Sequence, residues 1–96
     1  MKWSFHPDAE MEFIEAIDYY EGCESGLGED FAVEVYTTSQ NILAHPKAWP
    51  ALSGDTRRCL VNRFPYGVHY STEPDGIFLL AVMHLQRNPD YWKHRT

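Results

Sequence analysis

The chain has 96 residues, of which 44% are hydrophobic and 15% aromatic, enough for one compact core. We therefore expect a single domain over residues 1–96 without an internal linker. Fourteen Asp and Glu against eight Lys and Arg give a net charge of −6, which disfavours nucleic-acid binding through bulk electrostatics. No apolar run approaches the roughly 18 residues that span a bilayer, and the N-terminus lacks the pattern of a secretory signal. We expect a cytoplasmic protein without a membrane partner.

The first half of the chain predicts one short strand and two helices. Aromatic residues alternate with polar ones over residues 2–5, which is typical of a strand. Pro7 then opens a helix over residues 7–22, whose apolar positions repeat at helical spacing while acidic residues occupy the other faces. A second amphipathic helix is expected over residues 29–44, because His45-Pro46 ends the pattern.

The second half predicts a loop followed by strands. Residues 45–55 hold two prolines and one glycine, so we expect no regular structure there. Strands are expected over residues 56–62, 68–72 and 77–83, and the short turns between them force an antiparallel meander. The predicted fold is α+β: a short N-terminal strand and a two-helix hairpin packed on one face of a twisted, mainly antiparallel sheet, which a C-terminal three-strand meander completes.

The two cysteines, Cys23 and Cys59, show neither a paired spacing nor a neighbouring His cluster. Reduced thiols and the absence of a metal site are therefore expected, and no motif suggests a cofactor. The acidic residues concentrate in roughly the first third of the chain, whereas all five arginines lie in the last half. This distribution predicts a molecule with a charge dipole.

The apolar run over residues 77–83 leads directly into a cluster of polar and aromatic residues: His84, Arg87, Tyr91 and Trp92. A run of this length is typical of a strand covered on both faces, so the cluster lies where the chain leaves the sheet. Imidazole, guanidinium and phenol groups suit a phosphate, a base or an acidic partner. The alternative is that Tyr91 and Trp92 pack a C-terminal tail onto the core while His84 and Arg87 contact solvent.

Several segments in a fixed order carry a resemblance to a known family. They are Phe5-His6-Pro7-Asp8-Ala9, Leu27-Gly28, Ile42 with Pro46, Phe64-Pro65-Tyr66, and residues 81–92. Their order and spacing resemble the RelE/ParE toxin superfamily of type II toxin-antitoxin systems, in particular the ParE-type plasmid stabilisation branch. The resemblance implies a small toxin that a cognate antitoxin neutralises by covering the helical hairpin and the sheet. It also implies one of two activities: ribosome-dependent cleavage of mRNA through the substrate's own 2′-hydroxyl, or trapping of DNA gyrase on cleaved DNA.

The first of these activities needs a base, cations for the developing charge on the phosphate, and an acid for the leaving oxygen. His84 could serve as acid or base, Arg87 could hold the phosphate, and Tyr91 could stack on a base or donate a proton. Arg58 and Arg63 are further candidates for phosphate or target contacts. Since Arg57 and Arg58 are adjacent, a strand points them to opposite faces, and at most one shares a site with Arg87.

Two observations favour the gyrase poison over the ribonuclease. The ribonuclease branch usually carries an Arg on the middle strand, where this chain has Gly67 or Val68, and a Lys-rich strand before it. The net charge also opposes entry into a site walled by RNA. We therefore expect a ParE-like toxin with a contact surface of His84, Arg87, Tyr91 and Trp92, supported by Arg58 and Arg63. An mRNA endoribonuclease and a non-toxic peptide-binding relative stay open as alternatives. The amphipathic hairpin could support a dimer or a 2:2 complex with the antitoxin.

Overall fold

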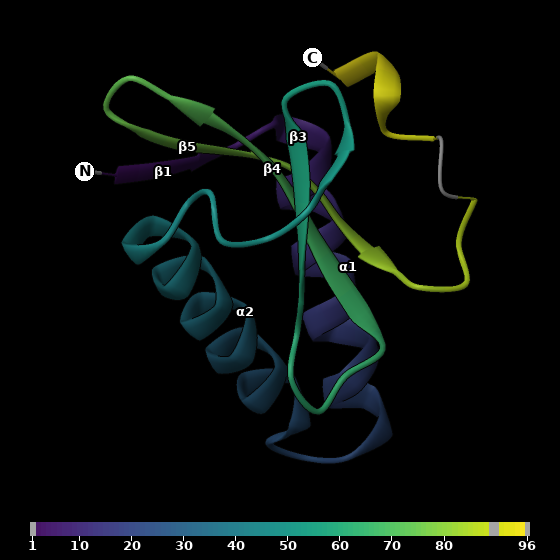
Figure 1. Ribbon diagram of the computed structural model, residues 1–96. Helices are drawn as coiled ribbons and strands as arrows, with labels where there is room; N and C mark the ends of the chain where they lie inside the picture. The colour runs from purple at the N-terminus through teal and green to yellow at the C-terminus, as the bar shows by residue number, and fades with distance from the viewer. Residues whose placement is uncertain (1, 89–90, 96) are drawn as a thin grey trace.

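A computed structural model describes residues 2–88 and 91–95 of the chain, and within them two helices pack against one face of a five-stranded sheet (Figure 1). The α+β prediction is confirmed. The elements are β1 (Lys2–Phe5), α1 (Pro7–Cys23), α2 (Leu27–Ala44), β2 (Ala51–Ser53), β3 (Thr56–Leu60), β4 (Tyr66–Glu73), β5 (Gly76–His84) and a 3₁₀ turn, η1 (Lys93–Arg95). None of the helices in these residues is both long and apolar enough to cross a membrane.

Helix α1 begins where the sequence predicts it. His6 is the N-cap, and its Nδ1 accepts a hydrogen bond of 3.1 Å from the backbone N–H of Asp8. Pro7 occupies the first helical position, where a missing N–H costs nothing. Asp8 and Glu10 lie in the first turn, where the helix dipole favours negative charge. The N-cap hydrogen bond, the proline and the two acids therefore all favour the start of the helix at Pro7.

Helix α2 begins at Leu27, two residues earlier than predicted, because the chain reverses direction at Gly26 with a φ of 88°. The Glu21 carboxylate accepts hydrogen bonds of 3.0 to 3.1 Å from the backbone N–H groups of Gly26 and Gly28. A Cβ on Gly28 would lie 2.6 Å from the carbonyl oxygen of Ile17. Glycine at this position therefore allows the two helices to approach closely at the closed end of the hairpin.

The sheet has the order β1-β5-β4-β3-β2, with β1 parallel to β5 and the other pairs antiparallel. The prediction of a loop over residues 45–55 is wrong at β2, which pairs with β3 across a turn at Gly54. The meander consequently has four strands instead of the expected three. All three residues of β2 are exposed, so this edge strand carries no alternation of apolar and polar residues by which the sequence could reveal it.

A bulge in β5 determines how its consecutive apolar residues are divided between the two faces of the sheet. His69 of β4 opposes Ala81, whereas the next residue, Tyr70, opposes Leu79, so Leu80 is an extra residue in β5. The insertion shifts the alternation of side chains by one position. Leu80, Ala81 and Met83 consequently pack on the face away from the helices, while Ile77, Leu79 and Val82 pack toward them.

The main core lies between the sheet and the helices. Its buried residues include Phe31, Val35 and Ile42 of α2 together with Val68 and Tyr70 of β4. A smaller apolar cluster lies on the other face, where Trp92 of the C-terminal segment covers β5 and is only 2% exposed. The expectation that β5 is covered on both faces is confirmed. Trp92 packs the C-terminal tail onto the sheet, as the second interpretation of this motif proposed.

Candidate functional site

The centre of the C-terminal cluster is a residue from the other end of the chain, Glu12 of α1. Its side chain is 11% exposed. It accepts hydrogen bonds of 2.9 and 3.0 Å from the guanidinium of Arg95, and one of 3.2 Å from the backbone N–H of Val82. Arg87 approaches the same carboxylate at 3.4 Å. Two cations and one backbone donor therefore compensate the charge of a single, nearly buried acid.

The sheet topology explains why Glu12 and Arg95 form hydrogen bonds to the backbone of β5. Strand β1 ends at Phe5, opposite Leu79, and no strand of the described residues pairs with this edge of β5 further on. The polar backbone groups of β5 beyond that point need other partners. Glu12 accepts from Val82, and Arg95 donates a hydrogen bond of 3.1 Å to the carbonyl of Leu80. The ion pair thus completes the hydrogen bonding of a partly unpaired strand.

Sequence reasoning missed both members of this pair as site residues. Arg95 is 8% exposed, although most arginines lie on protein surfaces. A weak signal existed for Glu12, because it lies three residues after Ala9 and four before Ala16, which are both buried. That spacing places the Glu12 side chain at the edge of the side of α1 that is buried. No local pattern marks Arg95.

Two guanidinium groups contact the Tyr91 ring. The guanidinium carbon of Arg87 lies 3.8 Å from the centre of the Tyr91 ring, and that of Arg95 lies 4.7 Å from it. Both arrangements are cation–π contacts. Burial raises the pKa of Tyr91 well above its ordinary value, and the nearby Glu12 carboxylate raises this pKa further. A phenol with a raised pKa is a weaker proton donor near neutral pH, so this environment does not suit the role of general acid.

His84 lies at the end of β5, next to these residues. Its Nδ1 accepts a hydrogen bond of 3.1 Å from the backbone N–H of Gln86, and its ring packs edge-on against Tyr66 at 5.3 Å. His84 and Arg87 line the same small hollow of about 160 Å³, which Glu12 and Glu15 also line. The structure therefore brings His84 and Arg87 together, but the neighbouring carboxylates oppose binding of a phosphate there.

The remaining arginine candidates lie elsewhere. Arg58 lines a separate hollow together with His69 and Trp92, on the face of the sheet away from the helices. Arg63 forms ion pairs of 3.6 and 3.8 Å with Asp30 and Glu34 of α2. The structure thus brings His84, Arg87 and Tyr91 together and places Arg58 and Arg63 in two other parts of the molecule.

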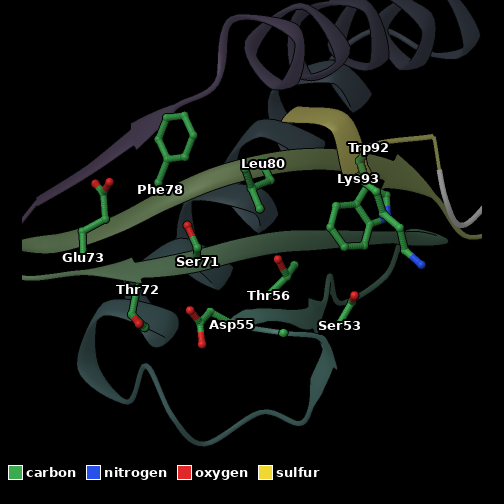
Figure 2. A pocket seen from close by; sticks show the side chains of 11 residues that line it. Ser53, Asp55, Thr56, Ser71, Thr72, Glu73, Phe78, Leu80, Trp92 and Lys93 are labelled. Atoms are coloured by element: carbon green, nitrogen blue, oxygen red, sulfur yellow. The ribbon is translucent and has the colours of Figure 1, made fainter. Parts of the chain in front are cut away.

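The open face of the sheet carries a hollow of about 570 Å³ (Figure 2). Trp92 and Lys93 lie at one end of this hollow and Glu73 at the other, as Figure 2 shows. Asp55 and several hydroxyl groups complete its polar lining: Ser53, Thr56, Ser71 and Thr72. The two carboxylates outnumber the single ammonium group of Lys93, so this hollow offers little net attraction for a nucleic-acid backbone.

His69, on the same face of the sheet, is a polar residue that sequence reasoning did not single out. It is 1% exposed, its ring packs edge-on against Trp92 at 4.8 Å, and neither ring nitrogen has a hydrogen-bond partner among the described residues. Burial lowers the pKa of His69 to about 4, and the nearby Arg58 lowers it as well. The ring is therefore neutral at pH 7 and contributes no positive charge to the open face.

Two further observations concern metal and thiol chemistry. Across residues 2–88 and 91–95, no three His, Cys, Asp or Glu side chains are grouped so that they could hold a metal ion. Cys23 is exposed and Cys59 is buried, and both are free thiols.

Neither the family models nor the curated proteins that we compared with this chain include a match. The fold and the site define a small α+β domain in which Arg87 and Arg95 both contact Glu12 and the Tyr91 ring.

Proposed function

We propose that the chain is the toxin of a type II toxin-antitoxin system, a ParE-like member of the RelE/ParE superfamily that acts in the cytoplasm. It inhibits growth by trapping DNA gyrase on cleaved DNA, and a cognate antitoxin neutralises it. The ordered segments from Phe5 to Trp92 support this proposal, together with a fold of one strand, a helical hairpin and an antiparallel meander, which is the arrangement that the resemblance implies.

The observation that carries the choice between the two toxin activities is that Arg87 and Arg95 share one carboxylate, Glu12, so negative charge lies beside both cations. Arg87 and Arg95 both contact Glu12 and both lie over the Tyr91 ring. A ribonuclease of the predicted type needs cations that are free to stabilise a developing phosphate charge. Arg58, which is not engaged in this way, lies on another face with the neutral His69. This arrangement favours a protein that binds its target over one that cleaves RNA.

The contact surface that we propose for gyrase is the segment that follows β5. Leu85 and Arg87 are exposed there, and the packed Tyr91 and Trp92 hold the C-terminal segment beneath them in place. Trp92 is buried, so its role in this proposal is to support the surface and not to touch the target. Arginine is enriched at protein interfaces relative to the rest of the protein surface.

The first experiment measures the incorporation of labelled nucleotide and labelled amino acid during the minutes after the chain is expressed in bacteria. Under the proposal, DNA synthesis falls first. In a second measurement, the purified protein is mixed with bacterial DNA gyrase and supercoiled plasmid, and linear DNA is expected to accumulate after detergent treatment. Arg87→Ala is expected to reduce this accumulation several-fold. Lys47→Ala removes an exposed cation in the loop before β2 and serves as the matched control without effect.

Other outcomes distinguish the alternatives. If protein synthesis falls first and ribosome-bound mRNA is cut, the chain is an endoribonuclease and the gyrase proposal fails. If neither synthesis falls while the protein is folded and soluble, it is a non-toxic relative that binds peptides. Light scattering on the chain with and without its antitoxin separates a monomer from a dimer and from a 2:2 complex.

A further inference from the structure

Arg58 differs from the other arginines of the chain in its lack of a polar partner. Its guanidinium makes no hydrogen bond or ion pair with any residue in the described part of the chain. The other four donate to backbone carbonyls or pair with carboxylates: Arg57, Arg63, Arg87 and Arg95. The stem of Arg58 lies over Gly67 of β4, where an added Cβ would be 3.1 Å from the Arg58 Cδ. Its charged end is therefore available to an anion from outside.

The strand register places Arg58 on the open face of the sheet. Cys59 packs in the main core, so its two neighbours in β3, Arg58 and Leu60, point to the other face. Arg58 lies directly opposite His69 of β4, and Leu60 lies opposite Gly67. Arg58 thus comes from the middle of a paired strand, which positions it more precisely than a loop would.

A hollow of about 280 Å³ lies on one side of Arg58, and we call it the edge hollow. Its lining is Trp49, Pro50, Leu52, Arg58 and Leu60. Within the described residues, Arg58 is the one charged side chain of this lining, and Leu52 and Leu60 are 42% and 55% exposed. The loop that carries Trp49 is attached to the sheet, because Arg57 donates a hydrogen bond to the Trp49 carbonyl. The edge hollow is therefore an apolar surface depression with a single cation.

A second hollow, of about 200 Å³, shares Leu52 and Arg58 with the first, so the two adjoin. We call it the tryptophan hollow. His69 and Trp92 also line it and are 1% and 2% exposed, and their ring nitrogens have no hydrogen-bond partner among the described residues. Lys93 lies in the same lining, which includes no acid of the described chain. A buried N–H without an acceptor costs free energy, so an acceptor bound here would be stabilising.

We propose that the two hollows form one binding site for a small monocarboxylate with an apolar body, such as a short-chain or medium-chain fatty acid. The two oxygens of the carboxylate match the parallel N–H groups of the Arg58 guanidinium. The apolar body lies in the edge hollow against Trp49 and Leu60. The ring nitrogens of His69 and Trp92 are covered, so the indole must shift for one of them to donate to the same carboxylate.

Size and charge select this class of ligand. An apolar cavity of about 150 Å³ is enough for one benzene-sized group, so the edge hollow accommodates a chain of several carbons. The net charge of −6 repels an anion in proportion to the charge that the anion carries. A monoanion is therefore favoured over a nucleic acid or a polyphosphate. This site lies outside the proposed function and does not depend on it.

Nuclear magnetic resonance on the full chain tests the proposal, with sodium octanoate as the probe. The chain has three tryptophans, whose indole N–H groups give separate signals. Trp49 and Trp92 line the two hollows, whereas Trp3 packs against Tyr36 of α2 on the helical side of the sheet. Octanoate is expected to shift the signals of Trp49 and Trp92 in a saturable manner and to leave the signal of Trp3 unchanged.

Four comparison probes separate the contribution of the carboxylate from that of the apolar body. Octylamine carries the opposite charge, octanol carries no charge, and acetate has almost no apolar body. Each is expected to bind at least about tenfold more weakly than octanoate. A short single-stranded oligonucleotide is the fourth probe, and it is expected not to bind, because it carries many negative charges.

Two variants with matched controls locate the site. Arg58→Gln removes the guanidinium and is expected to weaken octanoate binding about tenfold or more. Arg63→Gln removes a guanidinium that pairs with acids of α2 and is expected to have less than about a twofold effect. Leu60→Ser removes an apolar contact and is expected to weaken binding several-fold, whereas Val33→Ser changes an equally exposed position of α2 without effect. Circular dichroism verifies that every variant is folded.

Several results would overturn the proposal. Equal binding of octanol or octylamine would reduce the site to an exposed apolar patch, and equal binding of acetate would reduce it to a contact with anions in general. Tighter binding of the oligonucleotide would make this face a nucleic-acid surface instead. The absence of a saturable shift at Trp49 and Trp92, or variants that behave like their controls, would exclude the site. All of these measurements use the purified chain, so they are independent of whether it inhibits growth.

Discussion

Arg95 and Glu12 lie 83 residues apart in the chain, yet two hydrogen bonds of 2.9 and 3.0 Å join their side chains. The pair connects the C-terminal turn to the first helix and lies against β5 where β1 has ended. Together with the packing of Trp92 against β5, this pair fixes the C-terminal segment to the rest of the domain.

Removal of Arg95 is expected to destabilise the fold strongly. Arg95→Ala leaves Glu12 nearly buried without its main partner, which costs about 3 kcal/mol of unfolding free energy. Arg87→Ala removes the exposed cation from the same carboxylate and is expected to cost less than about 1 kcal/mol. Urea denaturation of both variants measures the difference. Equal losses would mean that the buried pair contributes no more than a surface pair.

The stability of the domain is expected to depend on the protonation of His69. Its pKa is lowered from 6.5 to about 4 in the folded chain, so the unfolded chain binds more protons between these values. Stability is therefore lost as the pH falls from about 6.5 toward 4, by about 1 kcal/mol per pH unit. His69→Phe keeps a ring and removes the titration. The difference in unfolding free energy between this variant and the native chain should change with pH over that window and be constant above it.

The hairpin offers a matched pair of glycines. Gly28→Ala places a methyl group 2.6 Å from the carbonyl oxygen of Ile17, so the helices must separate, and we expect a loss of about 1–3 kcal/mol. Gly22→Ala lies in α1 with no atom within 4 Å of the new methyl group, and a gain of about 0.5–1 kcal/mol is expected from helix propensity. Thermal denaturation shows whether each variant is less or more stable than the native chain. A destabilised Gly22→Ala would show that this end of the helix is constrained in another way.

The two thiols should differ in reactivity. Cys23 is exposed, whereas Cys59 is buried and its burial raises the pKa of the thiol to about 11. Because the thiolate is the reactive form, iodoacetamide at pH 8 is expected to label Cys23 alone in the folded protein. Mass spectrometry after labelling counts the modified thiols. In Cys23→Ser, labelling should appear only when denaturant is added, and labelling of the folded variant would contradict the burial of Cys59.

Local patterns predicted most of the fold. The helical spacing of apolar residues and the proline at position 7 indicated α1, and the short turns of the second half indicated antiparallel pairing of β3, β4 and β5. These signals can be recognised in the sequence because they depend on residues that are only a few positions apart. Strand β2 was not readable, since three exposed residues become a strand only through pairing with β3.

The candidate site was predictable only in part. The sequence pointed to the segment after β5, and His84, Arg87 and Tyr91 do lie near one another there. It could not indicate that Glu12 neutralises this segment, because that depends on where β1 ends along β5. The separation of Arg58 and Arg63 from the site likewise follows from the pairing of strands and from the acids of α2.

By itself, therefore, the sequence determined the two helices, the strands other than β2, the order of these elements and the acidic character of the helices, because each of these is a property of neighbouring residues or of composition. Only the tertiary structure decided that Arg95 is buried against Glu12, that Leu80 is a bulge residue, and that the predicted cations are divided among three places. These features depend on contacts between residues far apart in the chain, which local periodicity does not encode.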